Sequence, residues 1–194
     1  MLRQLYDRTM KLAARRDALG VLGVVSFLES SVFPVPPDAL LIPMVLADRR
    51  RAWRIAGVCT ITSVLGGFAG YLIGWGLYEA VAQPVLAFYG HGEKFAAFRD
   101  MYNTWGAWIV LGAGLTPFPY KVITIASGVT GLSPLTFAVA SVLARGIRFY
   151  LEAALLWRFG PPIRDFIENR LGLVVTAGFV LLVGGFVAAK LVGQ

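Results

Sequence analysis

Six charged side chains lie within long apolar stretches of this sequence, where a charge is costly and therefore suggests a function. They are Glu29, Asp38, Lys121, Arg145, Arg148 and Glu152. At the centre of a lipid bilayer, one such charge costs at least about 2.5–3.5 kcal/mol. Carboxylates there can take up and release protons, and arginine and lysine can bind phosphate. These residue types favour a site where an anionic headgroup is exchanged against protons.

The two leading carboxylates lie on either side of a proline run. Glu29 precedes it, Asp38 follows it, and Pro34, Pro36 and Pro37 lie between them. A straight helix cannot hold these prolines, because each lacks a backbone donor and clashes with the preceding turn. Water and freed backbone groups gather at such a break, so we predict proton coupling for Glu29 and Asp38. The alternative is an internal salt bridge that only holds helices together.

A second break has the same design. Pro117 and Pro119 interrupt the apolar stretch 104–130, and Lys121 follows them directly. We predict a helix break at each of these prolines, as at those of the first run. We also expect the Lys121 ammonium to point into a polar cavity that it shares with the carboxylates, where it could bind a phosphate as a point charge.

Arg145 and Arg148 lie near the middle of the apolar stretch 132–157. Arg145 cannot easily reach either membrane surface from there, so it needs water or an anionic partner. The planar guanidinium group suits phosphate. We predict that both arginines bind substrate together with Lys121. Alternatively, Arg148 could pair with Glu152, four residues later on the same helix.

The composition indicates an integral membrane protein. Of 194 residues, 57% are hydrophobic and 15% are charged, whereas soluble domains carry about 25% charged residues. The net charge of +7 comes from basic residues that flank apolar segments. This arrangement indicates membrane topology and contact with anionic lipids rather than nucleic-acid binding.

The apolar stretches form two similar units. The basic segments 1–17 and Arg49–Arg54 flank the broken stretch 18–47, and the positive-inside rule places both in the cytoplasm. The stretch between them is therefore predicted to be a re-entrant hairpin, and 104–130 a second hairpin from the opposite face. A crossing helix follows each hairpin, which gives the inverted repeat of many transporters.

The predicted fold is thus an all-α integral membrane protein, with two opposed re-entrant hairpins that are each followed by a transmembrane helix. Its crossings are predicted at 55–82, 132–157 and 171–192, with an outward-facing connection at 83–103. Three regions follow: an amphipathic surface helix at 1–17, a membrane core at 18–160, and a cytoplasmic connection with the last helix at 161–194.

Glycines recur at four-residue spacing in the first crossing. They are Gly66, Gly70 and Gly74. Small residues at this spacing allow two helix backbones to approach closely. We therefore predict that this face of the crossing packs tightly against other helices.

The sequence carries few residues for enzyme or metal chemistry. Cys59 is the single cysteine and lies in an apolar run, and His91 is the single histidine and lies in a connection. These residues cannot supply a disulfide framework, a histidine-rich metal site or a nucleophile–histidine pair. We expect no catalytic residue, no metal and no cofactor.

Three motifs recur in an order and spacing that match a known family. They are Phe27-Leu28-Glu29 with Pro34-Val35-Pro36-Pro37-Asp38, then Gly66-Gly67-x-x-Gly70-Tyr71-x-x-Gly74, then Thr116-Pro117-Phe118-Pro119-Tyr120-Lys121 with Ala126-Ser127-Gly128. In these motifs the chain resembles the DedA family, also called the VTT-domain or SNARE-associated Golgi protein family, and it looks closest to the small YqaA-like branch. The resemblance covers roughly residues 20–160.

The resemblance implies a multi-pass protein of the bacterial inner membrane with a cytoplasmic N-terminus. It also implies transport or scrambling of lipids such as undecaprenyl phosphate and phospholipids, linked to the proton motive force and to membrane homeostasis. The family's acidic pair corresponds to Glu29 and Asp38.

The chain departs from the family pattern at the second hairpin. Many members carry an arginine before the central proline and another after it. Here Gly114 and Leu115 occupy the first region, and Lys121 lies near the second. Arg145 or Arg148 could take over that role from the following helix.

Two functions follow from these features. The first is a flippase or scramblase for a polyprenyl phosphate or phospholipid, coupled to protons. The second is a membrane scaffold that supports other enzymes, for which the charges within the membrane would be dispensable. The expected partners are membrane lipids and protons, and self-association into a homo-oligomer stays open.

Overall fold

The computed structural model describes residues 17–33, 36–84, 92–116 and 118–169. Within these ranges the regular structure is helical and contains no strand, so the predicted all-α fold is confirmed. The surface helix predicted at 1–17 lies outside the described residues except for its last residue. The crossing predicted at 171–192 lies outside them entirely.

The first two helices surround the first proline run. Helix α2 spans Ala18–Ser31 and helix α3 spans Asp38–Ala47. The backbone N–H of Val32 donates to the carbonyl of Leu28 and closes α2 before the break. Pro37 precedes α3 with a φ of −64°, the value to which the proline ring restricts it, and so starts the next helix without strain. The break predicted between Glu29 and Asp38 is confirmed.

The next helix is long and continuous. A 3₁₀ turn at Arg49–Arg51 (η1) leads into α4 at Ala52–Leu77, which ends in a π-helical turn at Tyr78–Ala82 (η2). In the part of the chain that the structure describes, Arg49–Ala80 is the helix that could cross a membrane by length and composition. It coincides with the crossing predicted at 55–82.

The second pair of helices surrounds the second proline break. Helix α6 spans Gly92–Leu115 and helix α7 spans Tyr120–Thr130. Pro119 lies in extended conformation directly before α7. At the other end, Gly131 has a φ of +65°, a left-handed conformation that glycine adopts at no steric cost and that ends the helix.

The connection predicted at 83–103 is largely wrong, because α6 already begins at Gly92. Residues 92–103 hold no proline, and their aromatic side chains recur at helical spacing. Phe95 lies against Tyr78 of η2, with ring centroids 5.2 Å apart, and Phe98 lies 6.0 Å from Tyr102. The charged residues of this segment suggested a loop, but its aromatic side chains lie along one face and the segment forms a helix.

Helix α8 spans Pro134–Asn169 and also extends beyond its prediction. The crossing was expected to end at 157 and to give way to a cytoplasmic connection at 161. Charged residues suggested the connection, but arginine and glutamate are good helix formers and do not end a helix by themselves. Most of the predicted connection that the structure describes is therefore helical.

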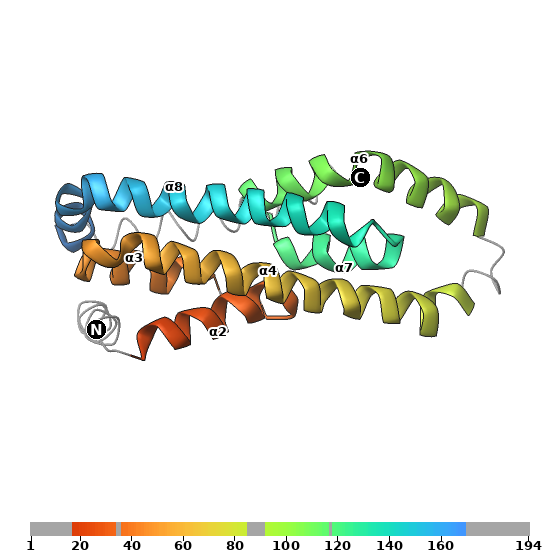
Figure 1. Cartoon of the computed structure of the whole chain (residues 1–194), viewed down its shortest axis with the longest axis horizontal. Coiled ribbons are helices and arrows are strands. Elements are labelled where there is room, and N and C mark those ends of the chain that lie inside the picture. Colours follow the sequence, from red (N-terminus) through yellow and green to blue (C-terminus); the bar gives the residue numbers. More distant parts are fainter. Residues whose placement is uncertain (1–16, 34–35, 85–91, 117, 170–194) are drawn as a thin grey trace.

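The helices form an elongated bundle in which the two hairpins enter from opposite ends (Figure 1). Helices α4 and α8 run along the bundle, and α2 and α7 both pack on α4. The two breaks meet near the middle. There the Lys121 ammonium donates to the Val32 carbonyl over 3.3 Å, and the Thr124 hydroxyl donates to the Ser30 carbonyl over 3.2 Å.

The bundle has polar groups within its apolar interior and many large apolar side chains on its outside. Its interior contains buried hydroxyl groups together with Arg145, whereas large apolar side chains cover much of its outside. The buried hydroxyl side chains are Ser26, Ser30, Ser31, Thr60, Ser63, Thr124, Ser127, Thr130 and Ser141. On α8, Leu135, Val139 and Leu151 are more than half exposed. Exposed apolar patches mark surfaces that contact a membrane, a protein or a ligand.

The glycines of α4 bring helix backbones into direct contact, as predicted. A Cβ atom on Gly66 would overlap the Phe27 carbonyl of α2, and one on Gly74 would overlap the Ile125 carbonyl of α7. From the opposite side, a Cβ atom on Gly128 of α7 would overlap the Tyr71 carbonyl of α4. Both hairpins thus pack tightly against helix α4.

This packing gives a first prediction. Gly74→Ala and Gly128→Ala should each lower the free energy of unfolding by roughly 1–3 kcal/mol, because the added methyl group must push two backbones apart. Gly76→Ala is the matched control, since a Cβ atom there meets nothing within 4 Å. Denaturant unfolding of the purified protein in detergent measures all three. Equal stability of Gly74→Ala and Gly76→Ala would contradict the close approach.

Candidate functional site

The most buried charge among the described residues lies where the first hairpin meets α8. The Arg145 side chain is 1% exposed, and its Nη2 donates to Oε2 of Glu29 over 2.7 Å. Its Nε donates to the Ser63 hydroxyl over 2.6 Å. The rings of Tyr120 and Phe149 lie 4.8 and 4.7 Å from the guanidinium carbon. The guanidinium is therefore held by an ion pair, a hydrogen bond and two aromatic rings.

A serine network orients the carboxylate partner. The Ser30 hydroxyl donates to Oε2 of Glu29 over 3.1 Å and lies 2.7 Å from the Ser63 hydroxyl. Since Ser63 also binds Arg145, these side chains close a ring of polar contacts between α2, α4 and α8. The network satisfies groups that would otherwise be costly to bury.

A second ion pair lies beside the first and joins α3 to α8. Nη2 of Arg148 donates to Oδ2 of Asp38 over 2.7 Å, and the two side chains are 24% and 25% exposed. Asp38 is the first residue of α3, where the helix dipole favours a negative charge. Nη1 of Arg148 reaches the Thr116 carbonyl at 3.4 Å. This pair is more accessible to solvent than the Glu29–Arg145 pair.

Two buried polar atoms of the cluster lack a hydrogen-bond partner among the described residues. They are Nη1 of Arg145 and Oδ1 of Asp38. A buried donor and a buried acceptor without partners each cost free energy. The site therefore has an unused donor suited to an anionic oxygen and an unused acceptor suited to a proton-bearing group.

The structure brings together four of the five charged site residues predicted from the sequence. Glu29 pairs with Arg145, and Asp38 pairs with Arg148. Arg145 was expected to need water or an anionic partner, and Glu29 is that partner. The structure does not place Lys121 in either ion pair, because its ammonium donates to the Val32 carbonyl over 3.3 Å in an exposed position. Its predicted role in substrate binding stays a prediction.

The predicted break residues that can be described lie at the ends of helices. Pro36 and Pro37 lie directly before α3, and Pro119 lies directly before α7. Pro34 and Pro117 lie outside the described residues.

The side chains that orient the ion pairs were not predicted from the sequence. Ser30 and Ser63 are fully buried and contact each other, and Tyr120 covers Arg145. A signal for one of them was present: Ser26 and Ser30 lie four residues apart, and so on one face of α2. Buried small polar residues at that spacing indicate a face that packs against other helices in a membrane.

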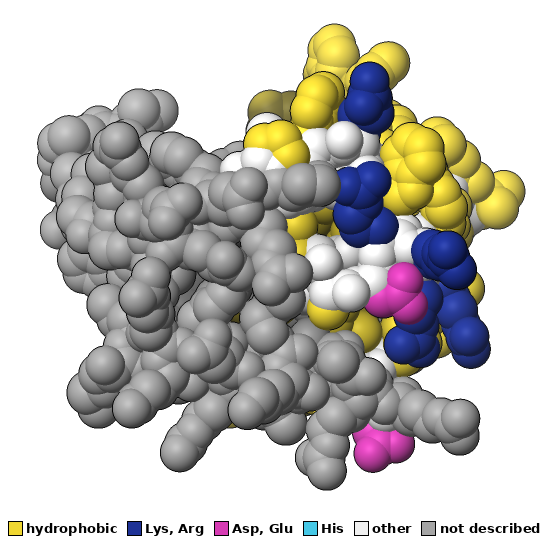
Figure 2. Space-filling view, turned by 90° about the vertical axis from the view of Figure 1, so that its left-hand side faces the viewer, with side chains coloured by type: hydrophobic (Ala, Val, Ile, Leu, Met, Phe, Trp, Pro, Cys, Tyr) yellow, Lys and Arg dark blue, Asp and Glu magenta, His cyan; other side chains and the backbone are white. Residues whose placement is uncertain are grey.

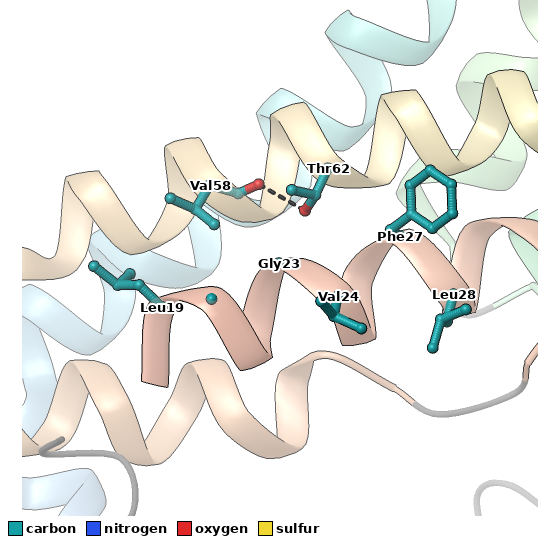
Figure 3. A pocket seen from close by; sticks show the side chains of 8 residues that line it. Leu19, Gly23, Val24, Phe27, Leu28, Val58 and Thr62 are labelled. Atoms are coloured by element: carbon teal, nitrogen blue, oxygen red, sulfur yellow. Dashed lines mark hydrogen bonds between the residues drawn. The ribbon is translucent and has the colours of Figure 1, made fainter. Parts of the chain in front are cut away.

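An apolar groove lies between α2 and α4 (Figure 3). It has a volume of about 380 Å³, and its lining residues are Leu19, Gly20, Gly23, Val24, Phe27, Leu28, Val58 and Thr62. Thr62 is the single polar side chain of the lining, and its hydroxyl is occupied because it donates to the Val58 carbonyl over 2.8 Å. The groove therefore offers hydrocarbon contacts. It reaches Leu28, the residue before Glu29.

Comparison with known proteins identifies relatives along almost the whole chain. The chain is 35% identical over 185 residues to an uncharacterized protein of Haemophilus influenzae, which covers 91% of the chain and 96% of that protein. It is 34% identical over 168 residues to an uncharacterized protein of Histophilus somni, which covers 84% of the chain and 87% of that protein. No family model matches the chain, and no solved structure matches it. The extent and identity of these matches show that the chain belongs to one family with these Haemophilus and Histophilus proteins.

Proposed function

We propose that this protein is a membrane lipid transporter, a flippase or scramblase, that moves a polyprenyl phosphate or phospholipid and couples this movement to protons. The observation that carries the proposal is the pair of carboxylate–arginine contacts between the hairpin breaks and α8. In a bundle with an apolar outside, charges at such a place are expensive and serve transport more often than stability.

The distribution of side chains supports a membrane location. Apolar residues cover much of the outside, hydroxyl groups lie inside, and Arg49–Ala80 is long and apolar enough to cross a bilayer. Figure 2 views the end of the bundle where lysine and arginine side chains gather beside apolar ones, and Arg49–Arg51 lie at this end. By the positive-inside rule, we assign this end to the cytoplasm.

In this proposal, the two hairpins are re-entrant and form an inverted repeat. Hairpins that enter from opposite ends and meet near the middle support this arrangement, because transporters place their substrate site at such broken helices. The helix ends at the two breaks contact each other through Lys121 and Thr124, and non-helical backbone at membrane depth is tolerated where protein or water surrounds it. The resemblance of the three motifs to the DedA family supports the same arrangement.

The mechanism is a competition for the arginines. A lipid phosphate and a carboxylate are alternative partners for one guanidinium, and both can bind it with two parallel hydrogen bonds. Protonation of Glu29 or Asp38 weakens its hold on Arg145 or Arg148 and frees the arginine for the headgroup. Release of the phosphate on the other side restores the ion pair as the proton leaves. Each transport step would then carry little net charge through the bundle.

The topology gives a second prediction. Arg50→Cys and Ser133→Cys, each in a Cys59→Ser background, should be labelled from opposite sides of the membrane. Both positions are exposed, one at the basic end and one between α7 and α8. A membrane-impermeant maleimide should label Ser133→Cys in intact spheroplasts and label Arg50→Cys only after permeabilisation. Labelling of both from the same side would contradict the assigned topology.

The ion pairs give a third prediction. Glu29→Gln and Asp38→Asn should insert and fold but transport lipid at least about tenfold more slowly, a change of about 1.4 kcal/mol in activation free energy. Glu93→Gln is the matched control, since Glu93 is an exposed acid at the start of α6. Liposomes that contain the purified protein and fluorescent undecaprenyl phosphate or phospholipid report the rate. Wild-type rates in both variants would favour the scaffold function instead.

The groove gives a fourth prediction. In this proposal the acyl chain of the lipid lies between α2 and α4 while its headgroup lies at the ion pairs, because the groove lining includes Leu28, the residue before Glu29. Gly20→Leu should fill the groove and slow transport several-fold without loss of stability, since a Cβ atom at Gly20 meets nothing within 4 Å. Gly112→Leu on α6 is the control, because its Cβ atom is equally free of contacts. Equal transport by both variants would exclude the groove as the path of the chain.

A further inference from the structure

One acid of the cluster is not used by the two ion pairs. Glu152 lies on α8, one turn after Arg148, and is half-buried. Arg148 is paired with Asp38 of α3. The carboxyl group of Glu152 instead lies close to that of Asp38. A hydrogen bond between them would need a proton on one of the two acids, because ionised carboxylates accept hydrogen bonds but cannot donate them.

We propose that Asp38 and Glu152 share one proton, and that this carboxyl pair is the proton-binding site of the protein. The assignment of the proton to the pair is independent of the transported lipid, whereas its use in transport rests on the function proposed above. Glu152 thereby becomes a functional residue of the site.

The unpaired oxygen of Asp38 supports this assignment. Oδ2 of Asp38 binds Arg148, while Oδ1 is buried and lacks a hydrogen-bond partner among the described residues. A protonated Glu152 would supply a donor for it. The pair then has one negative charge, which faces the guanidinium of Arg148 directly.

The charge balance of the cluster gives a second argument. The charged or titratable groups around the pair are Arg145, Arg148, Glu29, Cys59 and Tyr120, contributed by α8, α2, α4 and α7. The thiol and the phenol are ordinarily neutral at pH 7. Three carboxyl groups therefore face two arginines, and one proton makes the cluster neutral. The described charges of α6 and η1 lie toward the two ends of the bundle, away from this cluster.

The shared proton stabilises the arrangement seen here. Without it, two adjacent carboxylates would face one guanidinium, and like charges at this distance repel. Since Asp38 begins α3 and Glu152 belongs to α8, that repulsion would separate these helices at the hairpin break. Transfer of the shared proton from Glu152 to Asp38 would then neutralise Asp38 and weaken its hold on Arg148, which is the step that the competition for the arginines requires.

Infrared spectroscopy tests the assignment directly. The wild-type protein in lipid vesicles at pH 7 should show the carbonyl stretch of a protonated carboxylic acid, shifted by exchange into D2O. Glu152→Gln should lose one protonated carboxyl per chain and still fold, because its amide can donate to Oδ1 of Asp38. Glu93→Gln should keep the band. A band that persists in Glu152→Gln, or that is absent from the wild type at pH 7, would overturn the proposal.

Transport measurements separate this proposal from the function. Glu152→Gln should make lipid transport insensitive to pH over the range in which the wild-type band titrates. If the band behaves as expected but no lipid moves in any condition, the proton site stands and the transporter function fails. If lipid moves with unchanged pH dependence in Glu152→Gln, the proton that drives transport binds elsewhere and this proposal fails.

Discussion

Burial of the Arg145 guanidinium is the constraint on which much of this structure depends. A charge that is 1% exposed in an apolar bundle must have its partners supplied by the protein. Glu29 supplies the countercharge, Ser63 accepts the bond from Nε, and Tyr120 and Phe149 cover the two faces. These residues come from α2, α4, α7 and α8, so the hairpin breaks must meet where Arg145 lies. Removing Glu29 alone would leave a buried charge without its partner, which is why an isosteric amide is the informative substitution.

The glycines determine how closely this constraint can be met. Because Gly66 and Gly74 let α2 and α7 approach α4 to backbone contact, the last turn of α2 and the first turn of α7 lie within side-chain reach of each other. Short side chains such as Ser30 and Thr124 then suffice to link the hairpins. A larger residue on α4 would move the hairpins outward and lengthen every contact of the cluster.

Much of this arrangement could be predicted from the sequence, for reasons that are local. The two proline runs interrupt apolar stretches, where proline disfavours a continuous helix, and charges in such stretches are rare, so both hairpins and the charged site residues were identifiable. Which arginine pairs with which carboxylate could not be predicted, because Arg145 and Arg148 lie three residues apart on one helix face and either could reach either carboxylate. The orientation of Lys121 and the role of Ser63 depend on the rotation of helices that are distant in sequence. The helix at 92–103 was missed because its aromatic stripe is interspersed with charges.

The two helices of the first hairpin, α2 and α3, are held to the bundle by different kinds of contact. Helix α2 meets α4 through backbone contact at glycine, a steric fit that varies little with pH or salt, whereas the first turn of α3 is tied to α8 by Asp38 and its charged neighbours. An electrostatic attachment can be loosened by a single proton or anion, and a steric one cannot. The first hairpin thus has one arm, α2, that is fixed by a steric fit and another, α3, whose attachment a charge can loosen. Motion of this protein should therefore be concentrated in α3, and hydrogen exchange there should be faster and more dependent on pH than in α2.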